Sequence, residues 1–438
     1  MEKKYLKSLI FIAWPLFISE VISQIQMMID KMFLGRLDIK NMTALGNVSS
    51  PIWTTMSLVF TLAIGTTILA SQAMGAGKRN EAYGYICALF KYSSALSIVL
   101  FLLWCFLPEP IFRAMGVSES VLELCVAYSR IYSPVFITVG IGAAVNTMLQ
   151  VEQKTQYLMY YGILRALINI VLDWIMIFGK FGFPAMGIRG AALATTIAEF
   201  AGELAVLSLV ARDKKISLKP KMKDIFAAKF GLYINSIKLG LPSACEDFAW
   251  NFGSMMLIVV LNHVSDVAAG VYSIVFSVEL LPICAVAALS SATVTLCGRK
   301  TGEGCPKEIG KVVISALAIC AILCGTMLVF FIAIPTPILG LFTTDKEVLS
   351  MAAIYLIIVG IDLFPKSVNM QVGSGIKGYG NTKWMLGTQI FGTAFVIIMS
   401  RVVVYLLHGG IAAIFVVVVA DEFIRAVINS FKLKRITA

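Results

Sequence analysis

Apolar stretches long enough to cross a lipid bilayer recur along the whole chain. Residues 41–77 and 312–344 contain no Asp, Glu, Lys or Arg, and a helix that crosses the hydrocarbon core needs about 20 apolar residues. Apolar runs, punctuated by Pro, Gly and charged residues, predict twelve helices, near residues 9–34, 48–73, 85–107, 121–150, 155–178, 186–211, 232–262, 266–297, 309–334, 348–376, 384–407 and 409–431. Residues 411–420 are apolar on every face, whereas a membrane strand alternates strictly over about 10 residues. The pattern therefore predicts helices and no barrel.

Composition narrows the class further. Apolar residues make up 59% of the 438 residues and charged residues only 14%, whereas a soluble globular chain has about 25% charged residues. Together with the recurring apolar runs, this excludes a soluble enzyme and a soluble domain with one anchor. We predict an all-α polytopic membrane protein with twelve transmembrane helices.

The distribution of basic residues predicts the orientation of these helices. The formal net charge of +11 could indicate nucleic-acid binding, but the basic residues gather in alternate loops, as the positive-inside rule describes. Twelve spans place both termini and these loops on one side, with Lys3, Lys4, Lys7, Lys78, Arg79, Lys154, seven basic residues in 212–229, Arg299, Lys300, Lys307, Lys311, Lys377, Lys383, Lys432, Lys434 and Arg435. The opposite loops carry Arg36, Lys40, Arg113, Lys180, Arg189 and Lys346. We expect cytoplasmic termini, a plasma-membrane location and no nucleic-acid partner.

The longest connector divides the chain into two similar halves. Residues 212–229 form a basic cytoplasmic linker between six spans in 1–211 and six spans in 230–438. Several residues recur at a similar offset in the second half: Pro15 and Pro242, Gly75 and Gly298, Tyr132 and Tyr355, Thr155 and Thr382, Glu199 and Glu422. An even number of spans in each half makes the repeat parallel, with a pseudo-two-fold axis along the membrane normal. This symmetry is typical of secondary transporters, in which one six-helix bundle rocks against the other.

Ionisable residues inside the predicted spans are the candidate functional residues, because each costs at least about 2.5 kcal/mol at membrane depth. Asp30 lies late in the first span, and Asn169 and Asp173 share one face of the fifth because they are four residues apart. Thr195 and Thr196 lie in the sixth. Oxygen ligands of this kind suit a hard cation such as Na+, or a carboxyl group that takes up a proton.

Two structural alternatives compete with this interpretation. Asp30 could pair locally with Lys31 or Arg36 near the outer interface. Asn169 and Asp173 could instead join two helices by a hydrogen bond. The spans also contain acids whose facing the sequence does not determine, namely Glu20, Glu199, Glu203 and Glu279.

The chain resembles the multidrug and toxic compound extrusion (MATE) family along its whole length. The first half matches at Pro15, Asp30 with Leu34-Gly35-Arg36, Ala44-Leu45-Gly46, Gln72 to Gly77, and Asn169 to Asp173 followed by Gly187 to Thr195. The second half matches at Gly240-Leu241-Pro242, Lys377 to Thr382, and Arg401 with Tyr405. The resemblance implies that Asp30, Asn169, Asp173 and Thr195 form a cation-coupling site, with Asp30, Asn169 and Asp173 as ligands if the ion is Na+.

The second half departs from one branch of that family. Members of the branch carry a glutamate about two turns after the proline of the seventh span, a position that falls near Trp250 in this chain. They also carry an aspartate in the tenth span, about where this chain has Lys366. Glu246 and Asp362 lie about one turn before these positions. Lys366 could form an intramembrane ion pair with Asp362 or with Glu246, and all three are candidates for a substrate cleft.

Other patterns carry little functional signal. Residues 373–378 fit G-x-G-x-x-G but follow a helix, so the dinucleotide-binding context is missing, and close helix packing or a loop turn explains them better. The nine cysteines lack C-x-x-C spacing, and Cys320 and Cys324 lie four apart in an apolar helix. His263 and His408 lie near the outer ends of spans. We expect no cofactor, no ATP site and no enzymatic activity.

The sequence thus predicts a secondary multidrug efflux transporter of the MATE type. It would export cationic or amphipathic small molecules in exchange for inward Na+ or H+, as a monomer in the lipid bilayer. The alternative is a lipid-linked oligosaccharide flippase of the same superfamily. Such flippases line their cleft with several cations, and here Lys366, Arg401 and Arg165 are the deep basic residues. A polytopic membrane enzyme or a channel fits less well, because histidines are few and a channel gains nothing from the duplication.

Overall fold

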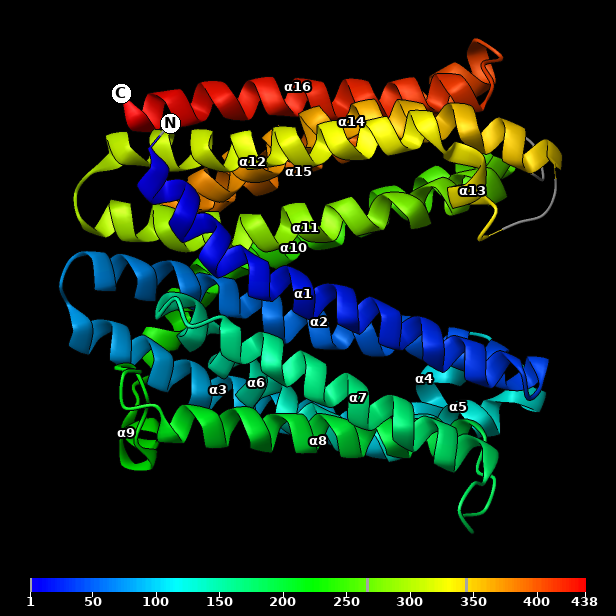
Figure 1. The fold of residues 1–438 in the computed structure, drawn as a ribbon, viewed down its shortest axis with the longest axis horizontal. Coiled ribbons are helices and arrows are strands. Elements are labelled where there is room, and N and C mark those ends of the chain that lie inside the picture. The colour runs from blue at the N-terminus through cyan, green and yellow to red at the C-terminus, as the bar shows by residue number, and fades with distance from the viewer. Residues whose placement is uncertain (1, 265–267, 343–345) are drawn as a thin grey trace. The chain divides into compact units, whose positions relative to one another are not determined.

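The computed structural model describes residues 2–264, 268–342 and 346–438, and within these ranges the chain forms helices and no strands (Figure 1). The helices are α1 (Lys3–Gly35), α2 (Ile39–Gly75), α3 (Arg79–Phe106), α4 (Pro108–Ala114), α5 (Glu119–Tyr132), α6 (Val135–Val151), α7 (Gln156–Phe178), α8 (Ile188–Arg212), α9 (Met222–Ala227), α10 (Phe230–Asn262), α11 (Ala268–Gly302), α12 (Pro306–Ala333), α13 (Pro335–Leu339), α14 (Lys346–Tyr379), α15 (Thr382–Arg401), the π-helical turn η1 (Val402–Leu406) and α16 (Ile411–Thr437). The all-helical prediction is confirmed. The side chain of Lys346, assigned above to an outer loop, lies outside the described part.

Each predicted span coincides with a helix or with two consecutive helices. Ten described helices are long and apolar enough to cross a membrane, and the pair α5 and α6, bent by 49°, would make an eleventh. The bend falls at Pro134, which has no N–H with which to continue the helical hydrogen bonds. The remaining predicted span is α16, whose apolar stretch contains Asp421, Glu422 and Arg425. A multi-pass membrane protein is therefore established, and twelve spans remain our proposal.

Short helices that the pattern did not predict flank two of the spans. α4 begins at Pro108 and α13 at Pro335. Proline favours the first position of a helix because its fixed φ suits the helix and its missing N–H has no partner there. The structure therefore starts a new helix at each of these prolines, just after a long span has ended.

The chain forms two compact units. The N-terminal unit comprises Pro15–Ala70 and Lys78–Gly240, and the C-terminal unit comprises Met1–Trp14, Ser71–Gly77 and Leu241–Ala438. The boundaries in α1 and α10 fall at or next to Pro15 and Pro242. The basic linker 212–229 belongs to the N-terminal unit, and the two lobes that we expect on either side of it remain a proposal.

Close helix packing supports the core of the N-terminal unit. Trp104 of α3 stacks on Phe136 of α6 with ring centroids 6.3 Å apart. A β-carbon on Gly140 of α6 would lie 2.5 Å from the carbonyl oxygen of Ser93, so these helices touch through their backbones. Small residues at such crossings are the usual means of close packing between membrane helices.

In the C-terminal unit, α14 packs against α11, α12 and α16. A β-carbon on Gly375 would lie 2.7 Å from Cγ2 of Val313, and one on Gly378 would lie 2.7 Å from Cβ of Cys297. The G-x-G-x-x-G pattern therefore lies inside α14 and serves helix packing, which decides between the helix packing and the loop turn considered above. Cys320 and Cys324 are buried in α12.

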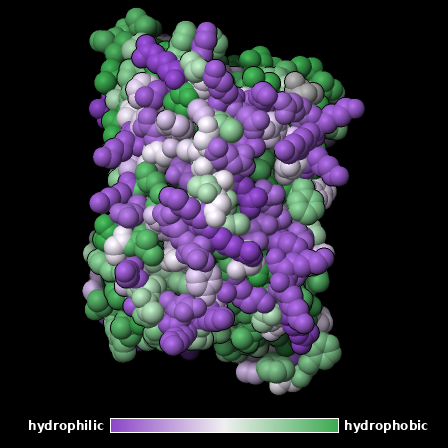
Figure 2. Space-filling view, turned by 90° about the vertical axis from the view of Figure 1, so that its left-hand side faces the viewer, coloured by the Kyte–Doolittle hydropathy of each residue, from purple (hydrophilic) through white to green (hydrophobic). Residues whose placement is uncertain are grey.

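Polar residues collect at one end of the C-terminal unit. Both chain termini and the connector between α11 and α12 lie at this end (Figure 1), and Figure 2 faces it and shows hydrophilic side chains gathered there. Lys311 pairs with Glu2 at 2.8 Å, and Lys300 pairs with Glu308 at 2.7 Å. These residues mark a water-facing end, although Lys300 and Lys311 lie inside α11 and α12 rather than in a loop.

Candidate cation-coupling and substrate sites

The carboxyl groups of Asp30 and Asp173 meet inside the N-terminal unit. Asp30 lies on α1 and is half-buried, whereas Asp173 lies on α7 and is fully buried. The two carboxyl groups are close enough to interact directly. Two ionised carboxylates this close repel each other, so the pair is suited to hold a proton or a cation between them. The hydrogen bonds of the described residues leave both oxygens of Asp173 without a partner.

Asn169 and Thr195 complete the predicted group. Asn169 is fully buried one turn before Asp173 on α7, and its Nδ2 donates a hydrogen bond to Oγ1 of Thr195 on α8, at 3.2 Å. Oγ1 of Thr195 donates in turn to the carbonyl oxygen of Ala191, at 2.9 Å. The structure therefore brings all four predicted residues together, and it also realises the helix–helix hydrogen bond considered as an alternative.

Asp30 has no local basic partner. Lys31 and Arg36 are exposed, and the ion pairs of the described residues do not join either of them to Asp30. Gln26, one turn earlier on α1, is buried, and no donor among the described residues reaches its Oε1. An amide oxygen of this kind adds to the oxygen atoms available to a small cation, and sequence reasoning missed it.

A buried ion pair lies beside this group. Nη1 of Arg165 on α7 is 2.6 Å from Oε1 of Glu199 on α8, and Nη2 of Arg165 donates to Oγ of Ser23 on α1, at 2.8 Å. The hydroxyl of Tyr161 donates to Oε2 of Glu199, at 2.6 Å. Glu203 is buried one turn further along α8, and its Oε1 accepts no hydrogen bond within the described part of the chain.

Carboxyl groups therefore outnumber cations in this region. Asp30, Asp173 and Glu203 have no basic partner among the ion pairs of the described residues, and Arg165 is used by Glu199. An uncompensated charge in a low-dielectric interior is costly, so a group of this kind binds a proton or a cation. Glu20 on α1 differs from these acids because it is exposed.

A second buried group lies in the C-terminal unit around Lys366 on α14. Its Nζ contacts the carboxylates of Glu279 on α11 and of Asp362, the latter at 3.0 Å. Of the two ion pairs considered from the sequence, the one with Asp362 is therefore present. Glu246 pairs instead with Lys377, at 2.8 Å, because α14 continues to Tyr379 and carries Lys377 inside the helix rather than in a loop.

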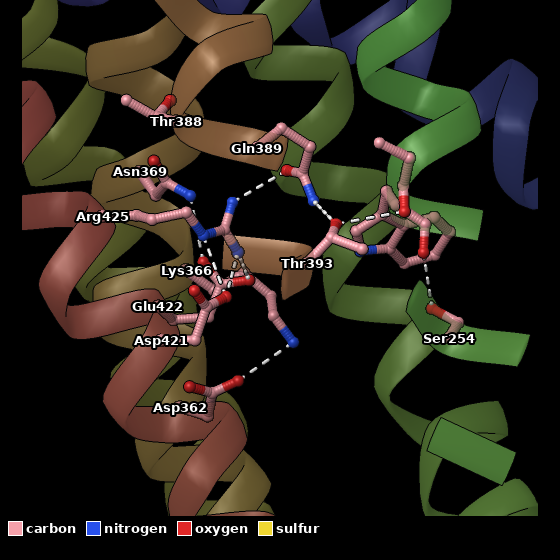
Figure 3. Close-up of polar contacts among 12 residues, drawn as sticks. Ser254, Asp362, Lys366, Asn369, Thr388, Gln389, Thr393, Asp421, Glu422 and Arg425 are labelled. Carbon is pink, nitrogen blue, oxygen red and sulfur yellow. Dashed lines mark hydrogen bonds and ion pairs between the residues drawn. The ribbon is translucent and has the colours of Figure 1, made fainter. Parts of the chain in front are cut away.

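Arg425 of α16 organises the neighbouring charges (Figure 3). Its guanidinium contacts Asp421 at 2.7 Å and Glu422 at 2.8 Å, and its Nη1 donates to Oε1 of Gln389 at 2.9 Å. Oε2 of Glu422 accepts from Nδ2 of Asn369, at 3.1 Å. The guanidinium of Arg425 thus contacts Asp421, Glu422 and Gln389, which all line one cavity.

The cavity itself lies between α10, α11, α14, α15 and α16 and has a volume of about 80 Å³. Its lining includes the charged residues Glu279, Asp362, Lys366, Asp421, Glu422 and Arg425 and the aromatic residues Trp250, Tyr272 and Phe276. Oδ1 of Asp362 and Oδ1 of Asp421 are buried, and the described residues supply neither with a hydrogen-bond donor. Four carboxyl groups therefore meet two basic side chains beside an aromatic surface.

Some residues of these groups were within reach of sequence reasoning and others were not. Asp421 and Arg425 are four residues apart in an apolar helix, a spacing that indicates a pair. Asn369 and Gln389 give no comparable signal. Arg401, considered deep from the sequence, is exposed at the end of α15, so it does not line an interior site.

Comparison with known proteins identifies the class. The MatE family model matches residues 15–175 and 242–402, and these segments begin at Pro15 and Pro242, the two residues that we aligned between the halves. The matches cover well over half of the chain. The protein is a membrane transporter, and it belongs to the MATE family.

Individual relatives agree with this assignment. The chain is 26% identical over 380 residues to the Probable multidrug resistance protein NorM of Thermotoga maritima, covering 86% of this chain and 80% of that one. It is 26% identical over 440 residues to the Uncharacterized transporter YisQ of Bacillus subtilis, covering 96% and 92%.

Solved structures share the fold. A MOP superfamily transporter from Pyrococcus furiosus, described as having a binding pocket of reverse polarity, matches with a TM-score of 0.89 and 20% identity over 99% of this chain and 96% of that one. An outward-facing multidrug resistance MATE family transporter matches with a TM-score of 0.89 and 19% identity, covering 99% and 97%.

Proposed function

We propose that this protein is a secondary multidrug efflux transporter that exports cationic or amphipathic small molecules in exchange for inward H+ or Na+. The observation that carries the proposal is the contact between the Asp30 and Asp173 carboxyl groups. The names of NorM relatives support the drug-export part.

The coupling ion acts by charge compensation at this contact. With a proton or Na+ bound, Asp30 and Asp173 can lie together; without it, two adjacent carboxylates in a low-dielectric interior repel each other. Loss of the ion therefore favours an arrangement in which α1 moves away from α7. Pro15 leaves α1 without one backbone hydrogen bond about four turns before Asp30, which supports movement of this part of the helix.

As the coupling ion, a proton would be held between the two carboxyl groups. A bridging Na+ would use Asp30, Asn169, Asp173 and their neighbouring oxygens as ligands, in keeping with the preference of hard cations for oxygen. Both ions neutralise the same pair, so the two cases share one mechanism and differ in which gradient drives transport.

Excess negative charge in both units supports cationic substrates. The cavity of the C-terminal unit joins unpaired oxygens of Asp362 and Asp421 to aromatic side chains, and aromatic faces attract organic cations. We assign Asp362 and Lys366 to a substrate site there. Glu246, bound to Lys377, belongs to a separate ion pair at which a cationic substrate would have to displace an ammonium.

The proposal also covers the domain arrangement, the oligomeric state, the location and the energy source of the protein. We propose two parallel six-helix lobes, 1–211 and 230–438, a monomer in the plasma membrane with cytoplasmic termini, and transport without a cofactor or ATP. Two MatE matches of equal length support the duplication. A lipid-linked oligosaccharide flippase has less support, because acids outnumber bases in both buried groups.

Transport into inside-out vesicles tests the proposal. Uptake of a fluorescent organic cation is measured with the lumen either acidified or loaded with Na+, one gradient at a time. We expect uptake driven by at least one gradient, and Asp30→Asn and Asp173→Asn should reduce it to the background of empty vesicles.

Asp38→Asn is the matched control, since it makes the same chemical change at an exposed position just after α1. It should transport like the wild-type protein. If well-expressed Asp30→Asn retains uptake with unchanged ion dependence, the coupling mechanism is wrong. If neither gradient drives uptake of any cation tested, the function is wrong.

A further inference from the structure

The basic linker of the N-terminal unit is a folded surface rather than a free loop. Residues 212–229 include α9, which leads directly into α10, the next apolar span (Figure 1). Two of its apolar side chains turn inward, since Ile216 is 4% exposed and Leu218 is fully buried. A segment that buries its own apolar residues presents the remaining side chains in a fixed arrangement.

A carboxylate at the end of α6 holds the first part of this segment. Oε1 of Glu152 accepts hydrogen bonds from the backbone N–H of Ser217 at 2.8 Å and of Leu218 at 2.7 Å. The hydroxyl of Ser217 also donates to it. Just before this point, Oδ2 of Asp213 accepts from the hydroxyl of Tyr157, at 2.9 Å.

Two side chains of α3 hold the second part. The hydroxyl of Tyr83 donates to Asp224 at 2.7 Å and accepts from the backbone N–H of Lys221 at 2.9 Å. Nζ of Lys91 donates to the carbonyl oxygens of Phe226 and Ala228, at 2.8 and 3.3 Å. The end of α9 is thereby tied to a transmembrane helix.

These contacts occupy the acids of the segment and leave its bases exposed. Asp213 and Asp224, its two acidic residues, are both engaged by tyrosine hydroxyls. The exposed bases include Lys214, Lys215, Lys221 and Lys223, and the ion pairs found among the described residues involve none of these four. The exposed surface of this segment, which carries these four lysines, is therefore strongly positive.

Large apolar side chains accompany these lysines. Met222 and Phe226 are four residues apart on α9 and are 67% and 69% exposed, and Phe230 at the start of α10 is 54% exposed. Exposed aromatic residues beside lysines, at the end of a membrane span, are the pattern of a segment that rests at the lipid–water interface.

We propose that this face of residues 212–230 binds the headgroups of anionic phospholipids, with Met222, Phe226 and Phe230 inserted at the level of the headgroups. The charge of the four lysines complements phosphate and carboxylate headgroups, and the apolar side chains continue the apolar surface of α10. Each basic residue near an anionic leaflet strengthens binding by about five-fold, so four together discriminate well between anionic and zwitterionic lipid. The inference rests on the membrane location of the protein and not on its proposed transport activity.

Quenching by brominated lipids tests the proposal on the full-length protein in proteoliposomes. Phe226→Trp introduces a reporter at the proposed contact, and its emission is taken as the difference from the wild-type protein. Brominated phosphatidylglycerol and brominated phosphatidylcholine are compared at equal fractions. We expect a relative binding constant several-fold in favour of phosphatidylglycerol, decreasing at high salt.

Removing the lysines gives the decisive comparison. A fourfold variant should lower the binding constant for phosphatidylglycerol relative to phosphatidylcholine toward one. It combines Lys214→Gln, Lys215→Gln, Lys221→Gln and Lys223→Gln. The matched control replaces Lys3, Lys4 and Lys7, another exposed basic group, and should leave this ratio unchanged. Met222→Trp, one turn earlier on α9, replaces the first reporter if that variant does not fold.

Two results would overturn the proposal. One is equal quenching by the two lipids with both reporters, and the other is a preference that survives the fourfold lysine change. Neither result bears on cation uptake, so this inference and the proposed transport function fail separately.

Discussion

Arg165 of α7 and Glu199 of α8 form an ion pair of 2.6 Å inside the N-terminal unit, next to the carboxyl groups of Asp30 and Asp173. Both partners are largely buried, with 17% and 10% of their side chains exposed. The guanidinium nearest to Asp30 among the described ion pairs is thus already bound to another carboxylate. The pair fixes α7 to α8 without neutralising the proposed coupling site.

Breaking this pair should destabilise the protein strongly. Glu199→Gln leaves a buried guanidinium without its counterion, which costs about 3–5 kcal/mol in comparable cases. We expect a lower apparent Tm in detergent. The double variant Arg165→Gln with Glu199→Gln should recover part of the loss, and a double variant worse than the sum of the single ones would contradict this account.

Replacing Lys366 should create a site for a small amine. Lys366→Ala leaves Glu279 and Asp362 without their common cation, and the apparent Tm should fall as for other broken buried pairs. Ethylammonium should restore it in a concentration-dependent manner, because it supplies the missing charge within the enlarged cavity. Ethanol should not restore it, and neither compound should stabilise the wild-type protein; equal effects of both compounds would disprove the charge argument.

Gly378 should tolerate no side chain. Its β-carbon would lie 2.7 Å from Cβ of Cys297 and 2.8 Å from the carbonyl oxygen of Val294, and overpacking of this kind costs about 1–3 kcal/mol. Gly378→Ala should therefore lower the apparent Tm. Gly387→Ala on α15 is the matched control, because no atom lies within 4 Å of the added carbon, and alanine favours a helix by about 0.5–1 kcal/mol over glycine.

Glu152 should control the accessibility of the basic linker. Glu152→Ala removes the acceptor of two backbone N–H groups, and hydrogen bonds to a charged acceptor contribute about 1.5–3 kcal/mol. Trypsin should then cleave after Lys214 or Lys215 about thirty-fold faster, as expected for a loss of about 2 kcal/mol in the free energy of local opening. Glu123→Ala, which removes an exposed ion pair with Arg189, should leave the cleavage rate unchanged.

Asp213 should make the same segment sensitive to acid. The backbone N–H of Lys215 and then the hydroxyl of Tyr157 hold the pKa of the Asp213 carboxyl below its ordinary value. A carboxyl group whose pKa is lowered in the folded state stabilises the protein at any pH above its unfolded-state pKa of about 3.9. This stabilisation is lost as the pH falls through the folded-state pKa. Asp213→Asn should thus lower the apparent Tm slightly at neutral pH, and its difference from wild type should vanish in acid. A difference that persists unchanged at low pH would disprove this role.

The sequence predicted the long helices, but it did not predict where a proline bends or starts one. The spans could be predicted because a bilayer demands long apolar helices, and every predicted segment coincides with helical structure. The bend at Pro134 and the short α4 could not, since whether a proline kinks, ends or starts a helix depends on the surrounding packing. The four-residue spacing placed Asn169 and Asp173 on one face of α7, whereas the grouping of both with Thr195 of α8 was implied by the family resemblance.

Contacts between distant helices were harder to predict. The sequence spacing of Asp362 and Lys366 indicated their pair, but it gave no means of recognising Glu279 as the second partner on α11. It also allowed Glu246 to pair with Lys366, because the length of α14 and hence the depth of Lys377 were unknown. Partner choice among buried charges depends on distances between helices, which periodicity along one helix does not contain.

The ammonium of Lys366 has a consequence for any ligand of its cavity. It is attached to α14 and already pairs with the carboxylates of Glu279 and Asp362, which would attract a cation. An incoming cation therefore competes with the Lys366 ammonium for these carboxylates, and the effective concentration of that ammonium is high. Such competition weakens binding, but it also means that the departing molecule leaves no bare charges behind. At the substrate site that we propose here, this competition favours release of the bound molecule, a property that a transport cycle needs as much as affinity.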